Sequence, residues 1–141
     1  MTPIGGRVSV AALSADGRWL ATGAETGGLR LWRVPDSPEF VPMDTPVFEF
    51  HNHWAGVGAL AFSADGRLLA AGGGDQTIRV WDVRDGRILA VLNGHDGGIT
   101  RLVLTPDERT LVSTGRDGRV CLWDLSPERL ALRPRYRPPA T

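Results

Sequence analysis

A stretch that ends in tryptophan occurs three times in this chain, and this repetition restricts the possible fold more than any other feature of the sequence. Its clearest copy, residues 94–124, reads GHDGGITRLVLTPDERTLVSTGRDGRVCLWD. Trp81 lies 42 residues before Trp123, and Trp32 lies 49 residues before Trp81. The same two spacings separate the aspartates of the first turn in each copy, which are Asp16, Asp65 and Asp107. Three copies in one register indicate a repeat protein built from similar structural units.

Each copy contains short apolar runs separated by turn residues. In the third copy the runs are 99–104, 110–115 and 119–125, with TPDER and RDG between them. Strands of this length and spacing, with no helical apolar period, are typical of an all-β protein. A fourth run follows each copy, at 47–50, 87–92 and 129–133. We therefore expect an all-β fold of three four-stranded antiparallel sheets.

The third copy begins with GH and ends with WD, and in this order it resembles the Trp-Asp (WD) repeat, the blade unit of a large β-propeller family. The second copy keeps the final WD, whereas the first ends in WR. The resemblance implies three blades within residues 1–133, at about 5–50, 51–92 and 93–133. Three blades cannot close a ring, so it implies an incomplete, open β-propeller or a part of an oligomeric or larger propeller.

Two segments lie outside the repeated pattern. Residues 35–46, PDSPEFVPMDTP, are rich in proline, which removes backbone donors, so we expect an extended loop on the first blade. Residues 134–141 are rich in proline and arginine, and we expect a disordered tail. The basic residues near this end could contact nucleic acid, but the formal net charge of the chain is zero. A solvated tail is the better interpretation, and nucleic-acid binding is not expected.

The resemblance also implies a hydrogen-bonded tetrad in each blade, formed by a histidine, a hydroxyl residue, an aspartate and the tryptophan. A buried indole N–H needs an acceptor, and a hydroxyl supplies one. The third copy has all four members, and the second has Ala71 in place of the hydroxyl residue. The implied tetrad positions are His95, Ser113, Asp117 and Trp123 in the third copy, His53, Asp75 and Trp81 in the second, and Thr22 and Trp32 in the first.

Several residues suggest chemistry, but each has a simpler structural interpretation. His51 and His53 have the spacing of a metal pair on a strand, but His53 occupies the tetrad position and a metal site needs further ligands. The single cysteine, Cys121, lies inside a predicted strand and is better explained as a packing residue. The glycine-rich segments open no helix and have no lysine, so they do not predict phosphate binding. We expect no metal, no cofactor and no catalytic residues, hence no enzyme.

The family usually binds other proteins through loops at the strand ends of one propeller face. By register, the corresponding residues here are Trp54, Asp96, Arg101, Arg116 and Glu25. We therefore expect a non-catalytic protein–protein interaction scaffold or regulatory module of the WD-repeat type. Self-association, or docking with other propeller blades, would cover the two open ends. The alternative is a structural remnant or C-terminal segment of a larger signalling protein, such as a kinase- or NTPase-linked propeller.

Charge and cysteine content restrict the surroundings of the protein. Sixteen basic residues balance sixteen acidic ones, so no general attraction to a polyanion or a membrane surface is predicted. No apolar run approaches the length of a membrane span. A single cysteine excludes a disulfide within the chain and fits a reducing compartment. We therefore expect a cytoplasmic protein.

Overall fold

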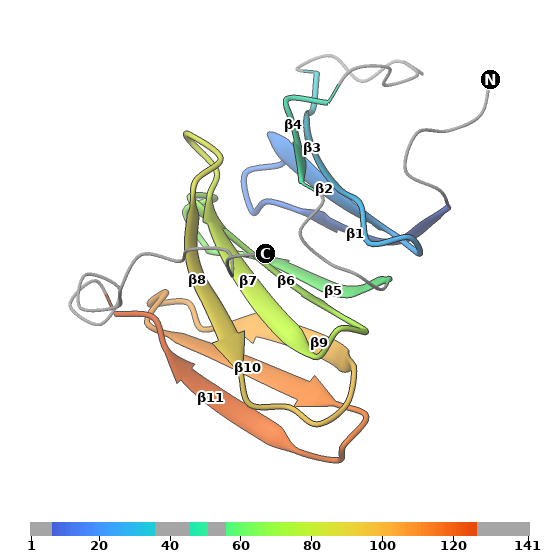
Figure 1. The fold of residues 1–141 in the computed structure, drawn as a ribbon. Coiled ribbons are helices and arrows are strands. Elements are labelled where there is room, and N and C mark those ends of the chain that lie inside the picture. Colours follow the sequence, from blue (N-terminus) through green and yellow to red (C-terminus); the bar gives the residue numbers. More distant parts are fainter. Residues whose placement is uncertain (1–6, 36–45, 51–55, 127–141) are drawn as a thin grey trace.

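The structure is a computed structural model of the chain, and it describes residues 7–35, 46–50 and 56–126. These residues form eleven β-strands and no helix. The strands make three antiparallel sheets that follow one another in an open arc, coloured blue to cyan, green to yellow, and orange in Figure 1. Over these ranges, no helix has the length and apolar character that crossing a membrane requires.

Strands that are consecutive in the chain are also neighbours in each sheet, because short turns connect most of them. The first sheet contains β1 (Val8–Leu13), β2 (Trp19–Ala24), β3 (Leu29–Arg33) and β4 (Phe48–Phe50). The second contains β5 (Val57–Phe62), β6 (Leu68–Gly73), β7 (Thr77–Asp82) and β8 (Ile88–Asn93). The third contains β9 (Ile99–Leu104), β10 (Thr110–Gly115) and β11 (Val120–Asp124). Between the sheets, β5 packs against both β1 and β9, so the first strands of the three sheets are neighbours.

An aspartate holds the turn between the first two strands of each sheet. In the first sheet, Asp16 Oδ1 accepts hydrogen bonds from the Ser14 hydroxyl at 2.6 Å and from the Arg18 N–H at 2.9 Å. Asp65 and Asp107 accept the same pair of bonds in the other two sheets. The hydroxyl donor and then the backbone N–H hold the pKa of Asp16 and of Asp107 below the usual value for aspartate. These carboxylates thus stabilise the turns.

The second sheet lies between two hydrophobic cores and is covered on both faces. Every residue of β6 is buried, and adjacent residues such as Leu69 and Ala70 belong to different cores because side chains alternate across a strand. The core between the first and second sheets contains Ala21, Leu29, Leu31, Val57, Leu69, Ala71, Trp81 and Val83. The core between the second and third sheets contains Ala59, Leu68, Ala70, Ile78, Val80, Ala90, Leu92, Ile99, Leu102, Leu111 and Leu125.

Two glycines at the same repeat position allow the sheets to approach closely. A β-carbon built on Gly23 would lie 2.6 Å from Cβ of Val57 in the second sheet. A β-carbon built on Gly72 would lie 2.5 Å from Cγ2 of Ile99 in the third sheet. Both distances are shorter than van der Waals contact, so a larger residue would push the packed sheets apart.

Two non-glycine residues of the described chain have a positive φ, Gln76 at 72° and Glu108 at 64°. Each sends its side chain to the neighbouring sheet. Gln76 Nε2 donates to the Asp96 carbonyl at 3.3 Å, and Glu108 Oε1 accepts from the Asp65 N–H at 2.7 Å. The left-handed backbone is unfavourable for both residues. Their side chains, however, connect the second and third sheets at opposite ends of the strands.

The predicted all-β architecture of three antiparallel sheets is confirmed. Eleven of the twelve expected strands are present. The ends of β4, β8, β9, β10 and β11 differ by at most one residue from the runs 47–50, 87–92, 99–104, 110–115 and 119–125. The expected strand at 129–133 and the tail at 134–141 lie outside the described residues, as does most of the proline-rich segment 35–46. The limits of the three-blade unit at residues 1 and 133 stay a prediction.

Candidate functional site

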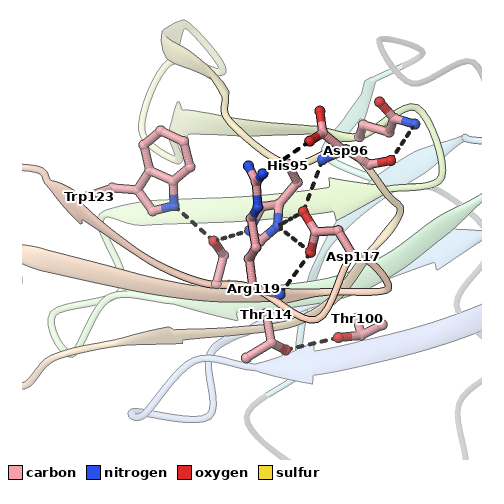
Figure 2. Close-up of polar contacts among 9 residues, drawn as sticks. His95, Asp96, Thr100, Thr114, Asp117, Arg119 and Trp123 are labelled. Atoms are coloured by element: carbon pink, nitrogen blue, oxygen red, sulfur yellow. Dashed lines mark hydrogen bonds and ion pairs between the residues drawn. The ribbon is translucent and has the colours of Figure 1, made fainter.

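Four polar side chains form a continuous network inside the third sheet (Figure 2). Trp123 Nε1 donates to Oγ of Ser113 at 2.8 Å, and the same Oγ lies 2.7 Å from Nε2 of His95. Nδ1 of His95 lies 3.0 Å from Oδ2 of Asp117. Because the Ser113 oxygen accepts the indole proton, the hydroxyl hydrogen can be donated to Nε2 of a neutral imidazole. This pattern places the ring proton on Nδ1, from which it is donated to Asp117.

The carboxylate at the end of this network is strongly stabilised in its ionised form. Burial alone would raise the pKa of Asp117, but its hydrogen bonds have the larger effect. The N–H of Arg119 donates to Oδ1 at 3.0 Å, the N–H of Asp96 donates to Oδ2 at 2.9 Å, and His95 adds a third donor. Together they lower the pKa of Asp117 to about 2. Asp117 is therefore ionised at neutral pH and orients the imidazole.

A serine, a histidine and an aspartate joined by hydrogen bonds also make up nucleophilic triads. The accessibility of Ser113 therefore decides whether this network could be catalytic. The Ser113 side chain is fully buried, and its oxygen already accepts the hydrogen bond of Trp123. An attacking hydroxyl must reach an electrophilic carbon of the substrate. The network therefore joins β10, β11 and the segment before β9, and it offers no accessible nucleophile.

The first and second sheets contain parts of the same arrangement. In the first, Trp32 Nε1 donates to Thr22 Oγ1 at 2.9 Å. In the second, buried Ala71 occupies the hydroxyl position, and the buried ring of Trp81 stacks on Phe50 of β4 with ring centroids 4.8 Å apart. Trp81 is thus held in the core between the first and second sheets. His53, the predicted histidine of this group, lies outside the described residues.

A buried ion pair in the second sheet was not predicted from the sequence, and it involves the aspartate at the tetrad position. Nη1 of Arg79 lies 3.2 Å from Oδ2 of Asp75, and both side chains are less than one-tenth exposed. Arg30, 49 residues before Arg79, pairs with Glu49 on the adjacent strand at 3.1 Å. A buried guanidinium requires a carboxylate partner. An arginine at the same position of two copies, between apolar residues, was the sequence signal for these pairs.

The aspartate of the second WD dipeptide is also paired. Asp82 Oδ2 lies 3.1 Å from Nη2 of Arg84 and 3.8 Å from Nε of Arg67. The Arg84 hydrogen bonds hold the pKa of Asp82 below the usual value for aspartate, against the opposing effect of burial. This carboxylate therefore binds the β7–β8 turn to the β5–β6 turn.

Three of the predicted partner-binding residues lie exposed in turns at one edge of the sheets. Glu25 follows β2, Asp96 precedes β9 and Arg116 follows β10. Glu25 and Arg116 occupy the same position of the first and third copies, so the repeat places them at the same edge. Asp96 is held by the N–H bond to Asp117, and its Oδ2 lies 3.4 Å from Nη2 of Arg119 (Figure 2). We call Glu25, Asp96, Arg116 and Arg119 the turn edge.

The other two predicted partner-binding residues are not placed at the turn edge. Arg101 is exposed but lies inside β9, opposite Thr114 of β10. Leu102 beside it points into the core, so Arg101 lies on the outer face of the third sheet. Trp54 lies outside the described residues. The register identified Arg101 as a surface residue but did not show which surface it joins.

The described ranges contain no group of three or more histidine, cysteine or acidic side chains that could hold a metal ion. His51 and His53, which have the spacing of a metal pair but were not predicted to bind one, fall in a range that the structure does not describe. Cys121 is a half-buried residue of β11. None of these observations assigns a cofactor to the chain.

Comparison with protein families agrees with the repeat geometry. The model described as WD domain, G-beta repeat matches residues 4–33, 44–82 and 86–124. Each matched segment ends at the last residue of a third strand, directly after its tryptophan. A search of curated proteins found no significant match. The matched segments cover most of the sequence. The first contains β1–β3, and the second and third each contain the last strand of one sheet followed by the first three strands of the next. The chain therefore belongs to the WD40 family and contains three of its repeats.

Proposed function

We propose that this chain is a non-catalytic protein–protein interaction module that acts as a scaffold or regulatory unit. WD40 domains in general mediate interactions between proteins. The observation that carries the proposal is the turn edge, where Asp96 is exposed while its backbone N–H is fixed by buried Asp117. Charged side chains on such fixed turns can be recognised with little loss of backbone freedom.

The charges of the turn edge indicate what kind of protein surface would fit. Glu25 is at the end formed by the first sheet, and Arg116 and Arg119 are at the end formed by the third. A partner with basic groups opposite Glu25 and acidic groups opposite the two arginines would be complementary. Such pairs determine orientation and association rate more than affinity.

A photo-crosslinking experiment tests this proposal. The photoreactive residue p-benzoylphenylalanine replaces Glu25, Arg116 or, as the control, Arg109, which is exposed in the β9–β10 turn at the opposite end of the strands. We expect the same crosslinked protein from positions 25 and 116, none from position 109, and loss of the product in R119E. Equal labelling from position 109, or no product from either turn-edge position, would refute the proposed binding edge.

The alternative function, a structural segment of a larger signalling protein, makes a different prediction. Both ends of the arc have open sheet faces, which further blades of a longer chain would cover. The adjoining reading frame is therefore informative. Additional repeats or a kinase or NTPase domain in the same frame would favour this alternative over an independent module.

We also propose a cytoplasmic location, supported by the single cysteine and the balanced charge. A fluorescent fusion of the full chain checks it, with soluble cytoplasmic fluorescence as the expected result. Fluorescence confined to a membrane or a secretory compartment would contradict the proposal.

A further inference from the structure

The two ends of the arc differ from its middle in what they expose. Six large hydrophobic side chains of the described residues are exposed: Val8, Leu13, Val47, Val103, Val120 and Leu122. Five belong to the first and third sheets, and Val47 directly precedes β4 of the first. The second sheet has none because it is covered on both faces. Exposed apolar residues gathered on one sheet face are typical of an interaction surface.

On the third sheet, the exposed residues occupy positions that are buried in the other two sheets. Leu122 is 71% exposed, whereas Val80 and Leu31, its counterparts 42 and 91 residues earlier, are fully buried. Val120 is 69% exposed, whereas its counterparts in the other two sheets are buried. In those sheets this face receives the next sheet of the arc. The outer face of the third sheet therefore has the apolar positions of a receiving face, and none of the sheets formed by residues 7–35, 46–50 and 56–126 lies on it.

The open face of the first sheet exposes residues that, in the other two sheets, are packed against the preceding sheet. Val8 is 61% exposed, whereas its counterparts Val57 and Ile99 are buried against the preceding sheet. Trp32 and Thr22 are on this face and only half-buried, while Trp81 at the same position of the second sheet is buried. We call the face that packs on the preceding sheet an inserting face. The first sheet therefore has the residues of an inserting face, and no other sheet in the described part of the chain receives it.

We infer that the outer face of the third sheet binds the open face of the first sheet in a second copy of this chain. This inference rests on the proposed interaction function and names one partner. The two contacts between sheets inside the chain are the template, because each joins a receiving face to an inserting face. One polypeptide carries the unused example of each. The contact joins different faces, so it continues into a closed ring or a chain of copies.

A hydroxyl group of the third sheet occupies the position from which Ser9 of the first sheet bonds to the second. Ser9 Oγ of β1 donates across the first contact to the carbonyl of Val57 at 2.8 Å. Thr100 occupies the Ser9 position in the third sheet, and its exposed hydroxyl lies 2.8 Å from that of Thr114. In the same packing, Thr100 would face the Val8 carbonyl of the second copy. The outer face thus offers a polar contact as well as apolar area.

One residue opposes the contact and makes it testable. Gly23 and Gly72 lie against Val57 and Ile99, with no space for a β-carbon. The corresponding residue of the third sheet is Thr114, which would meet Val8 of the second copy. Overpacking of this kind weakens a contact without abolishing it. We therefore expect self-association weaker than the packing within the chain, and expect it to strengthen when Thr114 is made glycine.

Sedimentation of the full chain over a range of concentrations tests the inference. Wild type should show a concentration-dependent mass above the monomer, T114G should associate about tenfold more tightly, and L122R should be monomeric. R109E, at the opposite end of the strands from the turn edge, is the matched surface control and should behave as wild type. Circular dichroism and thermal unfolding confirm that each variant is folded. Monomeric wild type and T114G at every concentration would overturn the inference.

Directed disulfide formation identifies the faces that meet. In a chain carrying C121S, the variant V8C is mixed with T114C and oxidised. The mixed pair should crosslink, whereas V8C alone and T114C alone should not, because the contact is between different faces. Crosslinking only within each single variant would overturn the inference. A monomeric protein that still gives the position 116 photo-crosslink would leave the proposed function intact and refute only self-association.

Discussion

Glu108 of the third sheet accepts a 2.7 Å hydrogen bond from the backbone N–H of Asp65 in the second sheet, and it does so from a left-handed backbone at φ 64°. The corresponding residues of the other two sheets are Gly17 and Gly66, with φ of 73° and 74°. Glycine adopts this conformation without strain. The position therefore combines an unfavourable backbone with a favourable bond between sheets.

Substitution at Glu108 separates these two effects. E108A keeps the strained backbone and loses the acceptor, so we expect a loss of about 1 kcal/mol in the free energy of unfolding. E108G also loses the acceptor but relieves the strain, so it should be about 1 kcal/mol more stable than E108A. Urea unfolding measures both variants. Equal stability of E108A and E108G would show that the strain has no energetic consequence.

Removing the hydroxyl of Ser113 should destabilise the third sheet. In S113A, Nε1 of Trp123 and Nε2 of His95 both lose their partner in the buried network. We expect a decrease of about 1–3 kcal/mol in the free energy of unfolding. S113T is the matched control because Thr22 already binds Trp32 with a threonine hydroxyl, and it should retain most of the stability. If S113A unfolds at the same urea concentration as wild type, the network does not stabilise the fold.

The close approach of Gly72 to Ile99 predicts a coupled effect on stability. G72A introduces a β-carbon 2.5 Å from Cγ2 of Ile99 and should cost about 1–3 kcal/mol through overpacking. I99A should cost about 2–4 kcal/mol because it leaves a cavity. The double variant should lose less than the sum, since the alanine at position 99 makes room for the new methyl group. Strict additivity in a double-mutant cycle would contradict this steric account.

The protein should become less stable in acid, because the stabilising effect of ionised Asp117 is lost there. Its pKa is about 2 in the folded protein and 3.8 for an ordinary aspartate, so between these values the unfolded chain binds more protons. The stability that this carboxylate contributes is present above about pH 4 and is lost as the pH falls towards 2. D117N should be less stable than wild type at neutral pH, and the difference should shrink across this window. A difference independent of pH between 5 and 2.5 would argue against the depressed pKa.

The repeat in the sequence was sufficient to predict the strands, and its resemblance to the WD repeat implied the network of the third sheet. Strand order and turn positions follow from local chemistry, since alternating apolar residues and Asp-Gly turns need no distant partner. The structure brings His95, Ser113, Asp117 and Trp123 into one hydrogen-bonded chain, as the resemblance to the WD repeat implied. The buried pair of Arg79 with Asp75 was not predicted, because a sequence shows a charge but not its burial.

A comparison of Val80 with Leu122 shows that position in the repeat does not determine burial. Val80 and Leu122 occupy the same place in the repeat, and both point to the same side of their sheets. Val80 is fully buried and Leu122 is 71% exposed. Arg101 differs from its prediction for a related reason, because its place inside β9 puts it on the outer face of the third sheet.

The sequence by itself determined that the chain repeats one pattern of strands and turns three times, which side chains share a sheet face, and which residues form the turns. The tertiary structure decided which of those faces are covered. Burial depends on whether another sheet is packed within contact distance, and that is a property of neighbours along the arc, not of the residue or its repeat. For this reason identical positions form a core in the second sheet and an open surface in the third.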